Sequence, residues 1–111
     1  MKEAMTEYWK EGFQIHIHTN GDLAMEVVLN IVEELNMKWP RGTTHRTTIE
    51  HAGFFTRDQA KLLAKLNCLV SAQPYYNYCL ADKYSEVLCS HNLLSYTYES
   101  FINILQQSCY M

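Results

Sequence analysis

The chain has 111 residues, a formal charge of −3 and an apolar fraction of 48%. This length allows one domain and is far short of the roughly 250 residues of a complete eight-stranded α/β barrel. Lysine and arginine form no cluster, which argues against a nucleic-acid partner. No apolar run reaches the roughly 20 residues of a membrane span, and the polar N-terminal segment is unlike a signal peptide. We therefore expect a globular chain without a nucleic-acid or membrane partner.

The cysteines favour a reduced, cytoplasmic chain. They stand at Cys68, Cys79, Cys89 and Cys109, and no two of them have the Cys-x-x-Cys spacing. Structural zinc sites usually use such paired spacing, so we do not expect one here. Unpaired, buried thiols are typical of proteins that fold in a reducing compartment.

Helical and strand-like patterns alternate along the first two thirds of the chain. Residues 3–11 have apolar side chains at helical spacing, and Gly12 is placed to end that helix. Residues 13–18 alternate between apolar and polar, which predicts a strand. A helix is predicted over residues 22–36, because apolar residues recur there along one face. That apolar stripe consists of Ala24, Val27, Val28, Ile31, Val32 and Leu35.

A second strand, a helix and a third strand are expected next. The predicted strands cover residues 47–50 and 68–72. The helix between them covers residues 56–66, and Thr56 with Gln59 forms a capping box at its start. Three strands joined by helical crossovers predict a parallel sheet and an α/β fold class.

Two histidines stand at the ends of neighbouring predicted strands. His18 ends the first strand, and His51 lies at the end of the second. Neutral imidazole is the commonest metal ligand, and catalytic zinc usually takes three protein ligands. The spacing alone leaves two interpretations open: either the pair binds a metal, or both are polar residues hydrogen-bonded to the backbone. His16 shares a strand face with His18 and is interpreted as a pocket residue near the metal.

Five further residues could line a substrate pocket or support the metal ligands. They are Asp22, Glu50, Gln73, Tyr75 and Tyr76. Simpler roles compete with these. Asp22 fits the first turn of a helix, where an acid complements the helix dipole. Glu50 is expected on the opposite face from His51, paired with Arg46 or with a helix. The tyrosines could equally be loop packing.

Three segments resemble ordered motifs of the amidohydrolase superfamily, in particular its family 3 branch, which is similar to N-substituted formamide deformylases. Residues 13–24 resemble the strand-5 motif, residues 45–52 the strand-6 motif, and residues 71–74 the strand-7 segment. The resemblance implies part of a (β/α)8 TIM barrel. It also implies that His18 and His51 bind a divalent metal, usually Zn²⁺, and that the substrates are small molecules with amide-type C–N bonds.

The chain also departs from this family. Leu23 stands where the branch often has arginine, and Asn67 stands where glycine is common. The strand-1 His-x-His, the strand-4 metal-bridging residue and the strand-8 aspartate have no counterpart. We therefore expect residues 1–87 to form a partial hydrolase barrel that lacks activity alone, and residues 88–111 to be a divergent tail with a helix over 92–106.

The alternative is a non-catalytic α/β interaction module that keeps the family's motifs without its chemistry. An open three-stranded sheet exposes strand edges, so self-association through them is plausible. If the chain is a slice of a barrel, the surfaces that met the missing strands are expected to be apolar and unpaired, with Ile15 and Val70 as candidates, and self-association is expected there as well.

Overall fold

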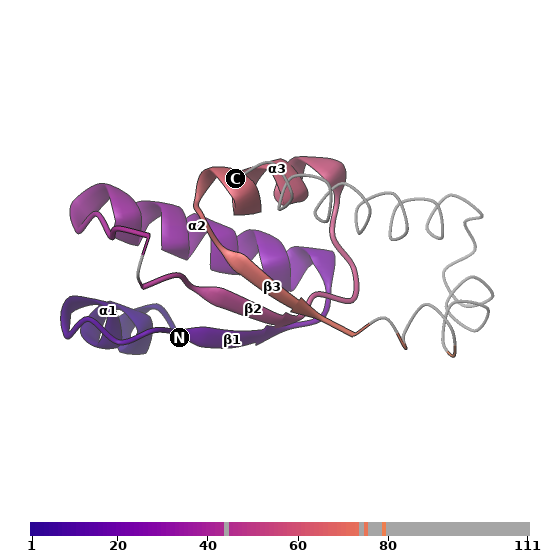
Figure 1. Ribbon diagram of the computed structural model, residues 1–111, viewed down its shortest axis with the longest axis horizontal. Coiled ribbons are helices and arrows are strands. Elements are labelled where there is room, and N and C mark those ends of the chain that lie inside the picture. The colour runs from indigo at the N-terminus through magenta and orange to yellow at the C-terminus, as the bar shows by residue number, and fades with distance from the viewer. Residues whose placement is uncertain (44, 74, 76–78, 80–111) are drawn as a thin grey trace.

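The computed structural model describes residues 1–43, 45–73, 75 and 79, so the predicted tail and its helix lie outside the described residues. The elements are α1 (Lys2–Lys10), β1 (His16–Thr19), α2 (Asp22–Lys38), β2 (Thr48–His51), α3 (Arg57–Lys65) and β3 (Leu69–Ala72). The strands form one parallel sheet in the order β1-β2-β3 (Figure 1). The predicted α/β class with three parallel strands is confirmed.

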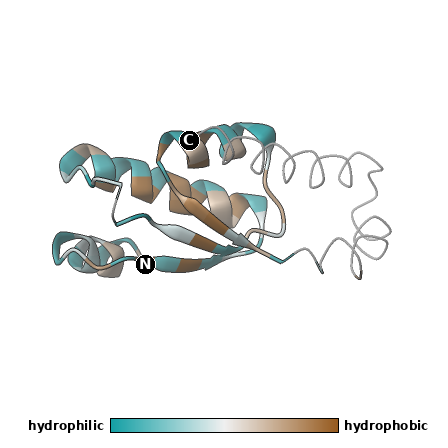
Figure 2. Cartoon of the chain, viewed as in Figure 1, coloured by the Kyte–Doolittle hydropathy of each residue, from teal (hydrophilic) through white to brown (hydrophobic). Residues whose placement is uncertain are grey.

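The hydrophobic core lies between the sheet and helices α2 and α3, which cover the same face of it (Figure 1). Met25 and Leu29 of α2 are 0% and 1% exposed, and Ile49 of the middle strand is 0% exposed. Ile17 and Val70 are in register with Ile49 and pack against this cluster from the two outer strands. Figure 2 shows the resulting hydrophobic band along the strands and α2. One row of strand residues therefore faces the helices.

Helix α2 is rotated relative to the predicted stripe. Ala24 is exposed and Val27 is 50% exposed, whereas Met25 and Leu29 are buried. The helix also continues to Lys38, two residues beyond the predicted end. Apolar residues surround much of this helix, so two overlapping stripes fit the helical period equally well. Contact with the sheet decides which stripe is buried.

Strand β1 is shorter than predicted. The alternation suggested residues 13–18, but the strand begins at His16. Phe13 is 58% exposed, and its carbonyl accepts a hydrogen bond of 2.7 Å from the guanidinium of Arg41. The Phe13 amide donates to the Tyr8 carbonyl at 3.1 Å, and the backbone contact with β2 begins only at Ile15, whose carbonyl accepts from the Thr48 amide at 2.8 Å.

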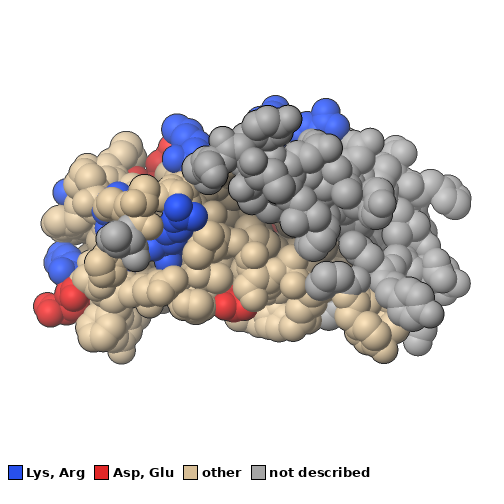
Figure 3. All heavy atoms as spheres, in the orientation of Figure 1, with Lys and Arg blue, Asp and Glu red and all other residues tan. Residues whose placement is uncertain are grey.

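The expectation that Ile15 and Val70 would be exposed is wrong. Both are partly buried and pack against the core, because they lie on the helix-covered side. The open face of the sheet carries mainly polar residues, with Leu69 an exception at 38% exposed. Basic side chains on the face drawn in Figure 3 lie in separate small groups among the described residues.

The predicted C-terminal end of α1 and the predicted N-terminal capping box of α3 are confirmed. Gly12 follows Glu11, the C-cap residue of α1, and has a φ of 80°, a conformation that glycine adopts without steric cost. The capping box of α3 is formed, since the Gln59 amide donates to Thr56 Oγ1 at 3.2 Å and Gln59 Oε1 accepts from the Thr56 amide at 2.9 Å. Gln59 Nε2 also donates to the Asp22 carbonyl at 2.8 Å, which ties the start of α3 to the start of α2.

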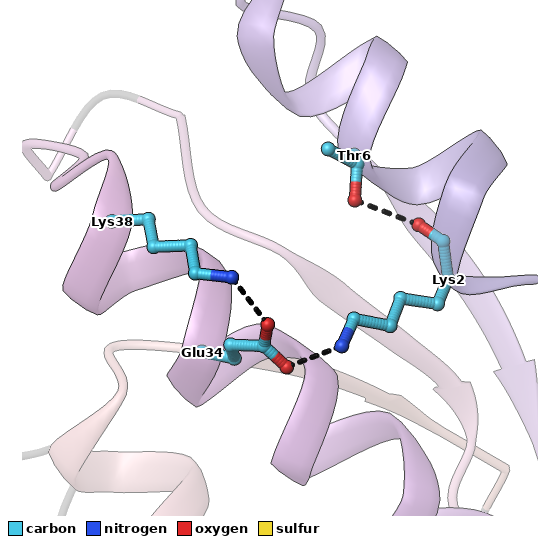
Figure 4. A network of polar contacts seen from close by, with 4 residues as sticks. All are labelled: Lys2, Thr6, Glu34 and Lys38. Carbon is cyan, nitrogen blue, oxygen red and sulfur yellow. Dashed lines mark hydrogen bonds and ion pairs between the residues drawn. The ribbon is translucent and has the colours of Figure 1, made fainter.

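An ion-pair network joins α1 to α2 (Figure 4). The carboxylate of Glu34 lies 2.6 Å from the ammonium of Lys2 and 2.6 Å from that of Lys38. Hydrogen bonds from Lys2 and then Lys38 lower the pKa of Glu34 from 4.5 to about 2. The network is solvent-accessible, so it contributes to the docking of α1 more than to the core.

The Glu34 network makes stability depend on pH. Because the folded-state pKa is depressed, the stabilisation is fully present above pH 4.5 and is lost as pH falls toward about 2. Urea unfolding should show that Glu34→Gln removes part of the acid sensitivity of the wild type across that window. Glu26→Gln, at an exposed acid on the same helix, is the matched control. Equal acid sensitivity in the wild type and Glu34→Gln would contradict the network.

The rotation of α2 predicts two different costs for similar truncations. Leu29→Ala removes a fully buried side chain and should lower the free energy of unfolding by about 2–5 kcal/mol. Val27→Ala removes a half-exposed one and should change it by about 0.5 kcal/mol or less. Urea unfolding of the two variants measures both. A larger loss of unfolding free energy in Val27→Ala than in Leu29→Ala would instead support burial of the stripe predicted from the sequence.

Candidate metal centre

His18 and His51 lie together at the C-terminal ends of β1 and β2. Their ring centroids are 4.3 Å apart, and the ring planes are inclined by 62°. The two strands are adjacent and parallel, so their C-terminal ends meet at one edge of the sheet. The structure thus brings together the two histidines that the sequence singled out.

His51 reaches this position through an unusual backbone conformation. It is in register with Thr19, which is 1% exposed on the core side of the sheet. A regular strand would therefore direct His51 toward the helices. Instead His51 has a φ of 73°, which swings its imidazole toward His18, and Ala52 continues the turn with a φ of 47°. Such left-handed residues cost roughly 1–3 kcal/mol each, and they concentrate at functional sites.

Glu50 does not have the neighbours predicted for it. It was expected opposite His51 and paired with Arg46 or a helix, but its Oε1 lies 2.7 Å from His16 Nδ1. Glu50 faces the open side of the sheet together with His16, while Arg46 donates to a backbone carbonyl. The turn at His51 ends the strand alternation, so adjacent residues 50 and 51 both reach histidines of β1.

A short polar ladder crosses the open face of the sheet beside the histidine pair. Hydrogen bonds from the Ser71 side chain and then from His16 hold the pKa of Glu50 below its usual range. The carboxylate is therefore ionised near neutral pH and fixes the His16 ring from one side. His16 remains half exposed, at 52% of its side chain. His16 pairs with Glu50 and is not part of the His18–His51 ring contact, and its role as a pocket residue near a metal stays a prediction.

The residues present fit a divalent metal in part. Two neutral imidazoles are suitable ligands for Zn²⁺, and the rings of His18 and His51 lie in contact, edge toward face. Within the part of the chain that the structure describes, no group of three or more His, Cys, Asp or Glu residues surrounds a common point. The pair therefore supplies two of the three protein ligands that catalytic zinc usually takes.

The remaining candidates lie around the same end of the sheet. Asp22 begins α2, and its Oδ1 accepts a 2.9 Å hydrogen bond from the next amide, consistent with a role at the helix terminus. Gln73 is exposed just after β3, and Tyr75 is 69% exposed. A hydrogen bond with Cys79 raises the pKa of Tyr75. Tyr76 lies outside the described residues.

The loops after β1 and β2 meet at Asn20 and Gly53, two residues to which the sequence assigned no role in the site. The Ala52 amide donates to the Thr19 carbonyl at 2.9 Å, and the Phe54 amide donates to the Asn20 carbonyl at 3.0 Å. A Cβ at Gly53 would lie 2.2 Å from Asn20 Oδ1. Each loop contains one small or turn-forming residue, but only the fold shows that the two meet.

Other reactive or concave features lie apart from this pair. Burial raises the pKa of Cys68 to about 11, so this thiol is a poor nucleophile near neutral pH. A pocket of about 500 Å³ is lined by Trp9, Trp39, Arg41 and residues beside them, before the N-terminal ends of β1 and β2. There Arg41 stacks 3.9 Å above Trp9 and donates to backbone carbonyls at the end of α1, which is a structural role.

No protein-family model, curated protein or solved structure matches the chain. Among the described helices, none combines the length and apolar character needed to cross a membrane. The interpretation of the site therefore depends on the geometry of its own residues and on the resemblance of its motifs.

Proposed function

We propose that the chain forms part of a cytoplasmic, metal-dependent hydrolase of the amidohydrolase type, built as a partial (β/α)8 barrel. Its substrates are small molecules with amide-type C–N bonds, such as N-substituted formamides. The observation that carries the proposal is the 4.3 Å separation of the His18 and His51 rings at adjacent strand ends. Parallel α/β barrels place their chemistry at that end of the strands.

The two faces of the sheet support a barrel arrangement. Helices α2 and α3 cover one face, as the outer helices of a barrel do (Figure 1). His16, His18, Glu50 and Ser71 belong to strand positions on the other face, which corresponds to the barrel interior. The titratable side chains of His16, His18 and Glu50 thus share the face that would point into a barrel.

The residues of this chain would hold a metal and orient the groups beside it. His18 and His51 are the ligands, and the Glu50–His16 pair fixes the polar surface next to them. When bound, a divalent ion of this kind polarises a carbonyl and lowers the pKa of a coordinated water. Two protein ligands give weak binding. Hydrolysis therefore requires further residues to complete the metal site and to accept the proton.

Zinc titration tests the proposal directly. In isothermal titration calorimetry near neutral pH, the wild type should bind about one Zn²⁺ per chain. His18→Ala and His51→Ala should each weaken binding by about tenfold or more, equivalent to about 1.4 kcal/mol. His45→Ala is the matched control, because His45 lies in the loop before β2 and beside the separate pocket.

The titration also has outcomes that contradict the proposal. A wild type that binds no Zn²⁺, or a His51→Ala variant that binds it as well as the wild type, would remove the metal site. Both β1 and β3 are edge strands of the described sheet, which favours a non-catalytic interaction module as the alternative. Metal-independent self-association in sedimentation velocity, combined with no zinc binding, would establish that alternative instead.

A further inference from the structure

The loops that follow β1 and β2 are fastened together immediately beyond the two histidines. We call this contact the loop clasp; it consists of Asn20, Gly53 and the backbone hydrogen bonds between residues 19–20 and 52–54. The two bonds, from the Ala52 amide to the Thr19 carbonyl and from the Phe54 amide to the Asn20 carbonyl, measure 2.9 and 3.0 Å. They extend the contact between the two chain segments past the last paired residues of the sheet.

A side chain at residue 53 fits into the loop clasp only if Asn20 moves. A Cβ there would lie 2.2 Å from Asn20 Oδ1 and 3.2 Å from the Asn20 carbonyl oxygen. The first distance is shorter than any real Cβ contact, so a methyl group must push the Asn20 side chain away. The second atom belongs to the backbone and accepts the hydrogen bond from Phe54, so it resists displacement.

Asn20 Oδ1 is buried and has no hydrogen-bond partner. A buried polar atom without a partner costs free energy. A hydrogen bond of this oxygen is therefore not what holds the Asn20 side chain against Gly53. The contact is instead the consequence of bringing the two loops as close as their backbones allow. The short distance between Asn20 and residue 53 therefore reflects how closely the two loops approach each other.

The loop clasp is placed to control the distance between the imidazoles. His18 lies two residues before Asn20, and His51 lies two residues before Gly53. The turn that directs His51 toward His18 occurs at residues 51 and 52, between the strand and the clasp. A displacement at residue 53 is therefore transmitted through a short, already strained segment to the His51 ring.

We propose that Gly53 is a positioning residue whose missing side chain holds the His18 and His51 rings in contact. The role of those rings as metal ligands rests on the proposed function, but the positioning itself is a property of the metal-free chain. Separating the loops by more than the few tenths of an ångström that the 3.2 Å backbone contact requires tilts His51 away from His18. Metal affinity falls because a chelating pair requires both nitrogens at defined distances from one ion.

The test compares two glycine-to-alanine variants of the full chain. Gly53→Ala adds a methyl group in the clasp, whereas Gly42→Ala adds one with no atom within 4 Å. Neither glycine has a positive φ, so neither change strains the backbone by itself. In the metal-free wild type and Gly42→Ala, nuclear Overhauser effects should connect the ring protons of His18 and His51. Gly53→Ala should lose them, and its Zn²⁺ affinity should fall by about tenfold or more.

A double variant separates the clasp from general instability. Asn20→Ala removes the atom nearest to the added methyl, so Asn20→Ala combined with Gly53→Ala should recover the ring contacts and most of the affinity. Asn20→Ala alone should keep both. If Gly53→Ala does not fold, the double variant provides the test. A double variant that folds and shows the ring contacts supports the role of the loop clasp. A double variant that folds without them, or that does not fold, overturns it.

The two proposals fail in different ways. If the wild type shows the ring contacts but binds no Zn²⁺, the proposed function fails, and the clasp is still judged from the ring contacts in Gly53→Ala. If Gly53→Ala keeps both the ring contacts and wild-type Zn²⁺ affinity, the clasp is overturned while the metal site stands.

Discussion

The positive φ angles of His51 and Ala52 decide on which side of the sheet the second histidine lies. Without this turn, His51 would share the side of Thr19 and face the packed core. A buried imidazole there would need a hydrogen-bond partner and would be remote from His18. The turn instead places two imidazoles against each other at the edge of the sheet, and the candidate site follows from that.

This strained segment depends on the ordinary packing around it. Ile49 is buried in the middle strand, and Ala52 and Phe55 are buried just beyond the turn, so the chain is anchored on both sides of His51. The backbone bonds from residues 52 and 54 to the β1 loop then limit where the turn can go. Strained backbone persists only where its surroundings over-determine it, and here the core and the neighbouring loop do so.

The open face of the sheet shows how the same strands serve two purposes. Every second residue of each strand points toward the helices and fills the core. The residues between them point to the open face, where Glu50 is hydrogen-bonded to His16 and Ser71. Because strand side chains alternate between faces, a core requirement on Ile17 and Ile49 automatically places their neighbours on the open side. The polar character of that face is thus compatible with a stable core.

Much of this architecture could be predicted from the sequence. Strand and helix order and the capping box at Thr56 follow from local patterns. Parallel topology places His18 and His51 at the same edge of the sheet, but the contact between their rings depends on the turn at His51, which strand alternation does not predict. The rotation of α2 could not, because apolar residues on several sides of that helix leave its orientation to the sheet.

The partners of Glu50 could not be predicted either. Glu50 keeps the regular strand alternation, and its partners His16 and Ser71 lie on the two neighbouring strands, so they depend on the register between strands and not on a local pattern. The contact of Asn20 with Gly53 is equally invisible in the sequence, because 33 positions separate the two residues and only the register of β1 with β2 brings them together. Local signals predict elements, whereas contacts between loops depend on the packed fold.

The central claim is that one ion can be held between the two imidazoles of this chain. Crystals of the protein soaked in a zinc salt, with diffraction recorded on both sides of the zinc absorption edge, test it most directly. The account predicts an anomalous peak between the His18 and His51 rings, with a ligand nitrogen of each about 2.0–2.1 Å from the ion. A zinc peak elsewhere on the chain, with the two rings free of metal, would contradict it.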